Sequence, residues 1–300
     1  MVTRLVQLEH PGFGRRVALA DGDDLHLLGT YRSAYAFATA ALDTGHKLRD
    51  LLSTDLTGIA LDYHAVHGLS SEWRFAPAFD VPEDQSHCLV TGCGRTYGAP
   101  PAPGDTGPTL FHKGTGECLR AHGEALEIPP FGRGGGEEAE LAAVYIIGKD
   151  GIPRRVGFAQ GNEFGDPALS AADPGAVSHA KLRTCSLGPE LLLDASISDV
   201  AGSIEIERAN SVLWSQKFRA GESHMQYNLR EVEQSLFRHA AHRKPDHGHV
   251  HYLGAAQGTY QGGTVLEAGD TVTVAFEGFG KPLVNRIARP EFEVPKIVPL

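Results

Sequence analysis

The sequence contains no long apolar run and no block of basic residues. No stretch approaches the roughly 18 consecutive apolar residues that mark a membrane-spanning helix, so we expect no transmembrane segment. Lysine and arginine are spread along a chain whose formal net charge at pH 7 is −10. An acidic chain without a basic patch is not expected to bind nucleic acid or an anionic membrane surface.

Cysteine is scarce, and the first residues show no secretory leader. The chain has 4 cysteines and no C-x-x-C pair. In a chain of 300 residues we expect these to be reduced thiols and not a disulfide framework. The opening residues, Met1-Val2-Thr3-Arg4, lack the basic-then-apolar pattern of a signal peptide. Together these features predict a cytoplasmic protein.

The residues that are abundant favour a β-rich α+β protein. The chain has 36 glycines and 18 prolines, which imply many turns, and 41% hydrophobic residues, which can bury a sizeable core. We predict a small N-terminal α+β domain over residues 1–75 and a larger domain over residues 76–300, strand-dense from about residue 109. Helices are expected over residues 33–41, with Gly45 closing the helix, over 47–52 and over 225–242.

The most informative motif is Glu138-Ala139-Glu140 at the start of an apolar run that ends at Ile147. In a strand, residues two apart point to the same face, so the two carboxylates are expected side by side. A turn and a second strand follow, and a hairpin would return Glu163 to this pair. Crowded carboxylates favour a hard divalent cation between them. The alternative is that the acidic pair is simply solvated.

Several further motifs follow one another in an order known from one superfamily. They are Leu110-Phe111-His112-Lys113, His122-Gly123-Glu124, the Glu138-x-Glu140 segment, Asn162-Glu163, Ala180-Lys181, Leu187-Gly188-Pro189 and Gly269-Asp270. Over roughly residues 85–290 the chain resembles the fumarylacetoacetate hydrolase superfamily. The resemblance implies a rolled, mixed β-sheet catalytic domain within residues 76–300, and a homodimer.

The resemblance also implies a bound Mg²⁺ or Mn²⁺ ion. By position, its ligands would be Glu138, Glu140 and Glu163. An all-carboxylate set suits these hard ions and not zinc. The third ligand is often Asp in the superfamily, and Glu163 is one methylene longer.

One departure from the hydrolase members points to a sugar-acid branch. Hydrolases of the superfamily carry a His and a Glu on a short lid helix, where they position the attacking water. The corresponding residues 91–100 have no His, no carboxylate occurs before Asp105, and the prolines oppose a helix. The pattern is more similar to the branch that includes 2-keto-3-deoxy-pentonate (arabinonate) dehydratases.

That branch implies a lyase that dehydrates a 2-keto-3-deoxy sugar acid to 2-oxoglutarate semialdehyde in pentose catabolism. The small-molecule 2-keto acid would chelate the ion, which acidifies its C3 protons; a base would then form a metal-bound enolate, and an acid would help the C4 hydroxide to leave. Glu124 and Lys181 stand where the branch has its acid/base pair, and we expect the Lys181 pKa to be lowered. Alternatively, Lys181 only neutralises the acids and Glu124 is a solvated residue at a strand edge.

Other residues are candidates for substrate contacts. Lys113 and Arg95 are possible partners for a carboxylate, or else they form surface salt bridges. The resemblance also places Thr184, Gly254 and Ala255 near the substrate, although many relatives have Thr at the position of Ala255.

Two other functions remain open. The first is a hydrolase or decarboxylase of acylpyruvate-type 2,4-diketo acids, which would need His67 or His87 to activate water. The second is a non-catalytic sugar-acid binding module. A zinc site among the histidines of residues 239–251 is disfavoured, because no Cys lies nearby in the sequence.

Overall fold

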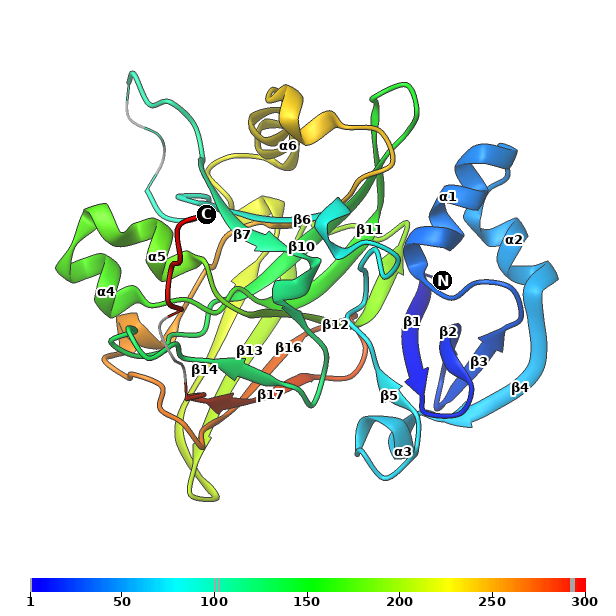
Figure 1. Ribbon diagram of the computed structural model, residues 1–300, viewed down its shortest axis with the longest axis horizontal. Coiled ribbons are helices and arrows are strands. Elements are labelled where there is room, and N and C mark those ends of the chain that lie inside the picture. The colour runs from blue at the N-terminus through cyan, green and yellow to red at the C-terminus, as the bar shows by residue number, and fades with distance from the viewer. Residues whose placement is uncertain (1, 100, 102, 292–294) are drawn as a thin grey trace.

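Two β-sheets form the framework of the protein (Figure 1). The computed structural model describes residues 2–99, 101, 103–291 and 295–300. The larger sheet has 12 strands. Ten follow the spatial order β4 (Leu56–Asp62), β3 (Asp24–Leu28), β2 (Gly14–Asp21), β1 (Thr3–His10), β12 (Cys185–Leu193), β11 (Pro153–Asn162), β10 (Ala139–Ile147), β15 (Gly248–Tyr252), β6 (Cys88–Gly94) and β7 (Thr109–Thr115). Off this path, β5 (Arg74–Phe75) pairs with β1, and β8 (Leu119–Arg120) pairs with β12.

The smaller sheet has 5 strands and packs against the larger one. Its order is β14 (Ser211–Ala220), β13 (Val200–Arg208), β16 (Thr271–Phe276), β17 (Leu283–Ala288) and β9 (Ala125–Glu127). Most neighbouring strands are antiparallel, but β15/β6, β12/β8 and β17/β9 are parallel. The β-rich α+β architecture with mixed sheets, which the sequence predicts, is therefore confirmed.

In the described part of the chain, six α-helices lie around the sheets. They are α1 (Ala34–Thr44), α2 (Leu48–Asp55), α3 (Tyr63–His67), α4 (Pro167–Ala172), α5 (Val177–Lys181) and α6 (Leu229–Phe237). Among the described residues, no helix is long and apolar enough to cross a membrane.

Local signals explain where the helices begin and end. The Ser33 side chain accepts a hydrogen bond from the Ala36 N–H, and Gly45 ends α1 in the left-handed region at φ 70°. Both boundaries agree with the prediction. The helix predicted over 225–242 is shorter: Asn228 and Glu231 form a capping box that starts α6 at Leu229, and Arg238 ends it. Short 3₁₀ turns lie on either side of the helix, at Glu222–His224 and Ala240–Arg243.

Strand β10 lies at the centre of the molecule, with all 9 of its residues buried. Its alternate residues face two different apolar clusters. Leu141 belongs to a cluster with Ile204 of the smaller sheet, whereas Ala142 belongs to a cluster with Phe37 of α1. The larger sheet is thus covered on both faces here, and any polar side chain at the start of β10 enters a largely apolar interior.

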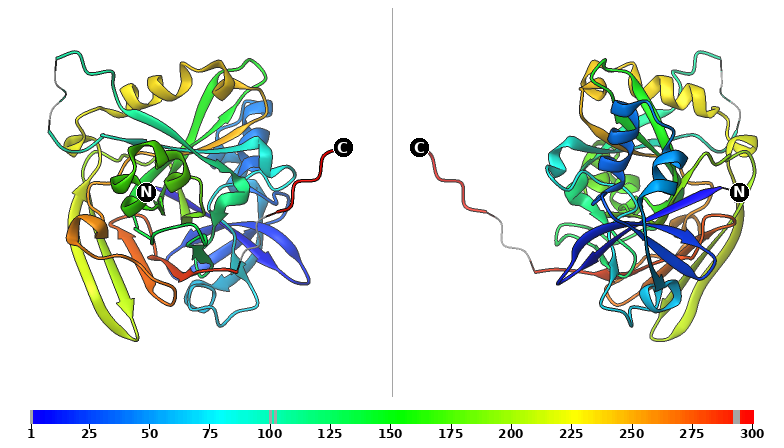
Figure 2. Two further views of the ribbon diagram at one scale, coloured as in Figure 1. Left: turned by 60° about the vertical axis from the view of Figure 1, so that its left-hand side comes forward. Right: turned by 90° about the vertical axis from the view of Figure 1, so that its right-hand side faces the viewer.

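The first four strands extend the larger sheet, because β1 pairs antiparallel with β12, from Thr3 opposite Leu193 to Val6 opposite Glu190. Figure 2 shows these N-terminal strands and the β13–β14 hairpin at opposite sides of the molecule in its left view. The division into domains at residues 75 and 76 stays a prediction.

Candidate active site

The hairpin of β10 and β11 brings the three predicted acids together. The two strands pair antiparallel with Glu140 opposite Gly161, and the Glu163 N–H donates to the Glu138 carbonyl oxygen at 2.9 Å. One carboxylate oxygen from each of Glu138, Glu140 and Glu163 lies within 4.8 Å of the others. In the described part of the chain this is the one group of three or more His, Cys, Asp or Glu side chains at such spacing. We call it the acidic cluster.

Burial makes the acidic cluster electrostatically costly. Glu140 and Glu163 are 1% and 0% exposed. Burial raises the pKa of Glu138 to about 7 and raises that of Glu140 well above its usual value. Burial also opposes ionisation of Glu163, but the ammonium groups of Lys113 and Lys181 outweigh it and lower that pKa.

The cluster fits a divalent cation. All its donor atoms are carboxylate oxygens, which Mg²⁺ and Ca²⁺ prefer. Glu140 Oε2 accepts from the Gly254 N–H at 2.7 Å, whereas Oε1 is buried without a hydrogen-bond partner among the described residues. A buried, unpartnered carboxylate oxygen is strongly disfavoured unless a cation or a donor compensates it. The longer Glu163 side chain reaches the other two acids, so it is compatible with the predicted ligand set.

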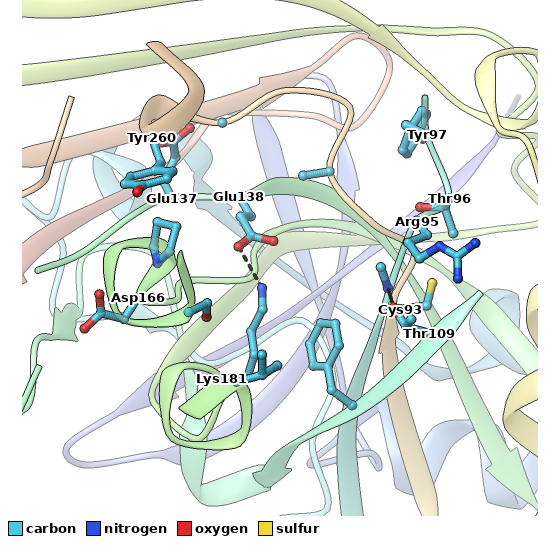
Figure 3. A pocket seen from close by; sticks show the side chains of 17 residues that line it. Cys93, Arg95, Thr96, Tyr97, Thr109, Glu137, Glu138, Asp166, Lys181 and Tyr260 are labelled. Atoms are coloured by element: carbon cyan, nitrogen blue, oxygen red, sulfur yellow. Dashed lines mark hydrogen bonds and ion pairs between the residues drawn. The ribbon is translucent and has the colours of Figure 1, made fainter. Parts of the chain in front are cut away.

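Lys181, the last residue of α5, lies on this cluster. Its ammonium contacts Glu138 Oε1 at 2.7 Å (Figure 3). It also contacts Glu163 Oε2 and stands 4.7 Å from the centre of the Phe111 ring. Burial alone would lower the Lys181 pKa, but the carboxylates of Glu163 and Glu138 raise it well above its usual value. The prediction of a lowered pKa assumed a cation beside the lysine. With two carboxylates as its nearest charges the ammonium form is favoured instead, and the sequence does not show that contact.

Lys113 has a different place from the one predicted. Its ammonium lies 2.5 Å from Glu163 Oε1 and donates to the Phe164 carbonyl oxygen at 2.6 Å. The side chain is fully buried and does not line the cavity beside the cluster. Both expectations, a substrate contact and a surface salt bridge, are corrected: Lys113 holds Glu163 from inside the protein.

A cavity of about 460 Å³ opens onto the acidic cluster. Its walls come from the end of β6 and the segment after it, from β7, from the residues just before β10, from helices α4 and α5, and from the loop after β15. Arg95 and Ala255, both predicted, line it. Arg95 forms an ion pair with Asp105, which also accepts from the Tyr227 hydroxyl at 2.6 Å. Figure 3 shows Glu138 and Lys181 between Arg95 on one side and Tyr260 on the other.

Gly254 supports the cluster and does not line the cavity. Its N–H binds Glu140, and its φ is 92°, a conformation that favours glycine. A Cβ atom there would lie 1.8 Å from Thr96 Oγ1. Gly254 therefore orients a carboxylate of the cluster.

Two predicted residues lie outside the cavity. Glu124 is exposed, and its carboxylate accepts from the Ala121 N–H at 2.6 Å. Thr184 Oγ1 accepts from the Glu127 N–H at 2.8 Å. The structure brings neither side chain to the cavity wall, so we do not carry forward the predicted catalytic role of Glu124 or the substrate contact of Thr184.

Glu137 lines the cavity, and the sequence analysis missed it. It is 1% exposed, and both its carboxylate oxygens lie within hydrogen-bond distance of the Thr259 N–H, at 3.0 and 3.1 Å. Burial raises its pKa to about 8. Two consecutive acids, Glu137 and Glu138, before an apolar strand are a visible signal, but alternation places only Glu138 with Glu140.

The described residues between β6 and β7 contain no helix, in agreement with the sequence. The two candidate water-activating histidines lie elsewhere. His67 Nε2 bonds to the Pro282 carbonyl oxygen, and the His87 ring stacks on His247 at 4.6 Å. Neither of them lines the cavity.

Of the histidines in residues 239–251, His249 and His251 on β15 are buried, whereas His239 is exposed. Both ring nitrogens of His249 are buried without a hydrogen-bond partner among the described residues, and Phe237 and His242 pack against the ring. Burial, with the nearby His242 and His251, lowers the His249 pKa to about 3. Burial also lowers the pKa of His251 to about 3, although its Nδ1 bonds to Thr91 Oγ1 at 2.8 Å.

We expect the variant His249→Leu to lose less stability than the wild type as the pH is lowered. A histidine whose folded pKa is depressed is protonated first in the unfolded state, so stability falls as pH drops below about 6.5. As the pH is lowered from about 7.5 to about 5, the free energy of unfolding of the variant should rise by about 2 kcal/mol relative to that of the wild type. The slope is ~1.4 kcal/mol per pH unit below pH 6.5. Urea unfolding at the two pH values measures this difference. The same change at exposed His46 is the control, and equal pH dependence in both variants would contradict the expectation.

Comparisons with known proteins show which solved structures have a similar fold. No family model and no curated protein matches the sequence. A structure of 2-keto-3-deoxy-D-arabinonate dehydratase complexed with magnesium and 2,5-dioxopentanoate superposes with a TM-score of 0.73 at 18% identity, covering 96% of this chain and 100% of that one. A 5-carboxymethyl-2-hydroxymuconate delta-isomerase from Mycobacterium smegmatis gives 0.66 at 20% identity, with 96% and 100% coverage. A 2-hydroxyhepta-2,4-diene-1,7-dioate isomerase from Mycobacterium marinum gives 0.65 at 18% identity, with 96% and 98% coverage.

These neighbours share the whole architecture with the present chain. The protein therefore has the fumarylacetoacetate hydrolase type of α+β fold, as its sequence motifs predict. Among the structural neighbours are both a dehydratase and isomerases, so the fold alone does not select a reaction.

Proposed function

We propose that the protein is a Mg²⁺- or Mn²⁺-dependent dehydratase of a 2-keto-3-deoxy sugar acid, forming 2-oxoglutarate semialdehyde in pentose catabolism. The observation that carries this proposal is the cluster of Glu138, Glu140 and Glu163, in contact with Lys181 at the wall of a cavity. The magnesium-bound arabinonate dehydratase among the structural neighbours supports the same reaction class.

The three acids would hold the ion, and neighbouring groups prepare them for it. The Gly254 N–H orients Glu140, and the Lys113 ammonium keeps Glu163 ionised. When bound, a divalent cation would polarise the keto oxygen of a 2-keto acid and so acidify the protons at C3. Glu140 Oε1 is buried without a hydrogen-bond partner among the described residues, so a bound ion would satisfy this oxygen.

Lys181 is our candidate for proton transfer. Dehydration removes one proton from C3 and hydroxide from C4. A proton shift from C5 to C3 then gives an enol across C4 and C5, and transfer of the enol hydroxyl proton to C4 leaves an aldehyde at C5. The Lys181 ammonium lies at the acidic cluster and also lines the cavity, so it can reach a group bound there. The Phe111 ring beside it limits water and favours the charged form. A positioned acid or base of this kind contributes about 10² to 10⁴ in rate.

Hydrolysis or decarboxylation of acylpyruvate-type diketo acids is the second candidate. It is less well supported, because no described residue that lines the cavity is a histidine. A hydrolase would have to activate water through Glu137. The other acids of the described cavity wall are engaged, because Glu138 belongs to the acidic cluster and Asp166 pairs with the buried Arg183.

The test is an assay of chelator-treated protein with Mg²⁺ or Mn²⁺ restored, against a panel of 2-keto-3-deoxy pentonates, hexonates and acylpyruvates. We expect metal-dependent release of an aldehyde and loss of one water, seen by mass, from a five-carbon 2-keto-3-deoxy acid. Cleavage of acylpyruvates alone would establish the hydrolase reaction. Ligand binding without turnover of any compound would establish the binding module.

A further inference from the structure

Two of the 4 cysteines lie side by side, although 67 positions separate them in the chain. The sulfur atoms of Cys118 and Cys185 are 3.8 Å apart. Strand pairing holds them there, because Cys185 begins β12 and Leu119, the residue after Cys118, stands opposite it in the parallel pair of β8 and β12. The sequence has no C-x-x-C motif, so this pair is visible only in the folded protein.

Exposure distinguishes Cys118 from the other cysteines. Cys88, Cys93 and Cys185 are buried, whereas Cys118 is partly exposed, so a small oxidant in the solvent can reach its sulfur. The Cys185 side chain is 0% exposed, and its sulfur also lies 3.9 Å from the Cys118 carbonyl oxygen. An accessible thiol with a second thiol in contact is the arrangement in which oxidation of the first leads to a disulfide.

A negative charge is stabilised on this pair. Burial opposes ionisation of Cys185, but the hydrogen bond from the Cys118 thiol and the Lys113 ammonium outweigh it and lower the pKa of Cys185. A proton that shifts from Cys118 to Cys185 across their contact leaves the thiolate on the accessible sulfur. The thiolate is the form of cysteine that reacts with peroxides.

The two sulfurs can form a bond without displacement of the strands. A disulfide has an S–S distance of about 2.0 Å and joins residues whose Cα atoms lie about 4.4 to 6.8 Å apart. Paired strands lie about 4.8 Å apart, so residues one place out of register across a pair fall within that range. Rotation of the two side chains can therefore close the present distance of 3.8 Å.

We infer that Cys118 and Cys185 are a modification site, which hydrogen peroxide oxidises to a disulfide and a dithiol reduces again. The Cys118 sulfur attacks one peroxide oxygen, the O–O bond breaks and hydroxide leaves, which yields a sulfenic acid. The Cys185 sulfur then forms the S–S bond and displaces the second hydroxide. The two thiols thus lose two protons and two electrons, and hydrogen peroxide is reduced to two molecules of water.

The bond has two physical consequences. It traps the sulfenic acid of Cys118 in a form that thiols can reduce, before oxidation proceeds to sulfinic acid, which thiols do not reduce. It also joins two distant segments, which lowers the conformational entropy of the unfolded chain and so stabilises the fold. Neither cysteine lines the cavity, so this inference is independent of the proposed function.

The experiment treats the reduced, full-length protein with hydrogen peroxide and follows its mass, thiols and stability. We expect the intact mass to fall by about 2 Da, because two hydrogens are lost. The thiols titrated after denaturation should fall by two from the 4 of the reduced chain, and peptide mapping without reduction should link Cys118 to Cys185. The melting temperature should rise by at least about 4 °C, and dithiothreitol should reverse these changes.

Variants assign the reaction to this pair. Cys118→Ser removes the accessible sulfur and should abolish both the loss of mass and the rise in melting temperature. Cys185→Ala leaves Cys118 without a partner thiol, so peroxide should carry it to sulfinic acid, which dithiothreitol does not remove. Cys88→Ala changes a buried cysteine outside the pair and should still form the Cys118–Cys185 link. If Cys185→Ala does not fold, Cys118→Ser and peptide mapping of the wild type decide the question.

Three results would overturn the inference. One is retention of all thiols in the folded protein at a peroxide concentration that oxidises the same chain in urea. Another is a disulfide between any other two cysteines, or between two copies of the protein. The third is loss of mass and thiols in Cys118→Ser to the wild-type extent.

Discussion

Replacing Glu140 by glutamine is expected to abolish metal binding without unfolding the protein. The change removes one of three carboxylate ligands, and we expect divalent-ion affinity and metal-dependent turnover to fall at least about 100-fold. The metal-free variant should be at least as stable as the wild type at neutral pH, because burial disfavours the ionised form of Glu140 and a neutral amide avoids that cost. Thermal melts with and without excess magnesium measure both effects.

The matched control is Glu277→Gln, which changes an exposed acid. It should retain the wild-type response to magnesium, about 2.7 kcal/mol of added stability when the ion is at 100 times its dissociation constant. A Glu140→Gln protein that still gains stability from magnesium to the wild-type extent would show that the ion binds elsewhere, and the proposed function would lose its basis.

Replacing Lys181 by alanine is expected to separate chemistry from metal binding. Turnover should fall by about 10³, because the variant lacks the side chain that we assign to proton transfer. Metal affinity should be equal to or higher than in the wild type, because the ammonium no longer competes for Glu138 and Glu163. The metal-free variant should lose stability, since Glu138 loses its counter-ion and the buried Glu163 keeps only Lys113, and magnesium should restore it.

Lys149→Ala is the control for this change, because Lys149 is an exposed lysine with its own acidic neighbour, Asp43, at 3.8 Å. Turnover near the wild-type rate in Lys181→Ala would remove Lys181 from the mechanism. Joint loss of turnover and of metal binding would instead assign it a structural role, as a counter-ion of the acidic cluster.

Features that depend on neighbours in the chain could be read from the sequence. The hairpin of β10 and β11 and the helix between Ser33 and Gly45 are of this kind. Strand alternation and helix capping involve only a few consecutive residues, so their residue patterns are visible in the sequence. The order of motifs then allowed the fold to be predicted, through the resemblance to one superfamily.

The places of the candidate charged residues could not be read in the same way. Lys113 and Glu124 are both charged residues near predicted strands, yet Lys113 is fully buried against Glu163 and Glu124 is exposed. Their difference depends on how β7 and β9 enter two separate sheets. Glu137 became a candidate only through the Thr259 loop, which lies 122 residues further along the chain.

The sequence by itself therefore determined that Glu138 and Glu140 share one face of a strand and that a short hairpin returns Glu163 beside them, because strand geometry is local. Only the tertiary structure decided how these acids are charged and what surrounds them. Burial raises the pKa of Glu140, and the Lys113 ammonium arrives from a strand 50 residues away to offset the cost of burying Glu163. Desolvation and ion pairing depend on contacts between distant segments, so they appear only when the sheets have packed.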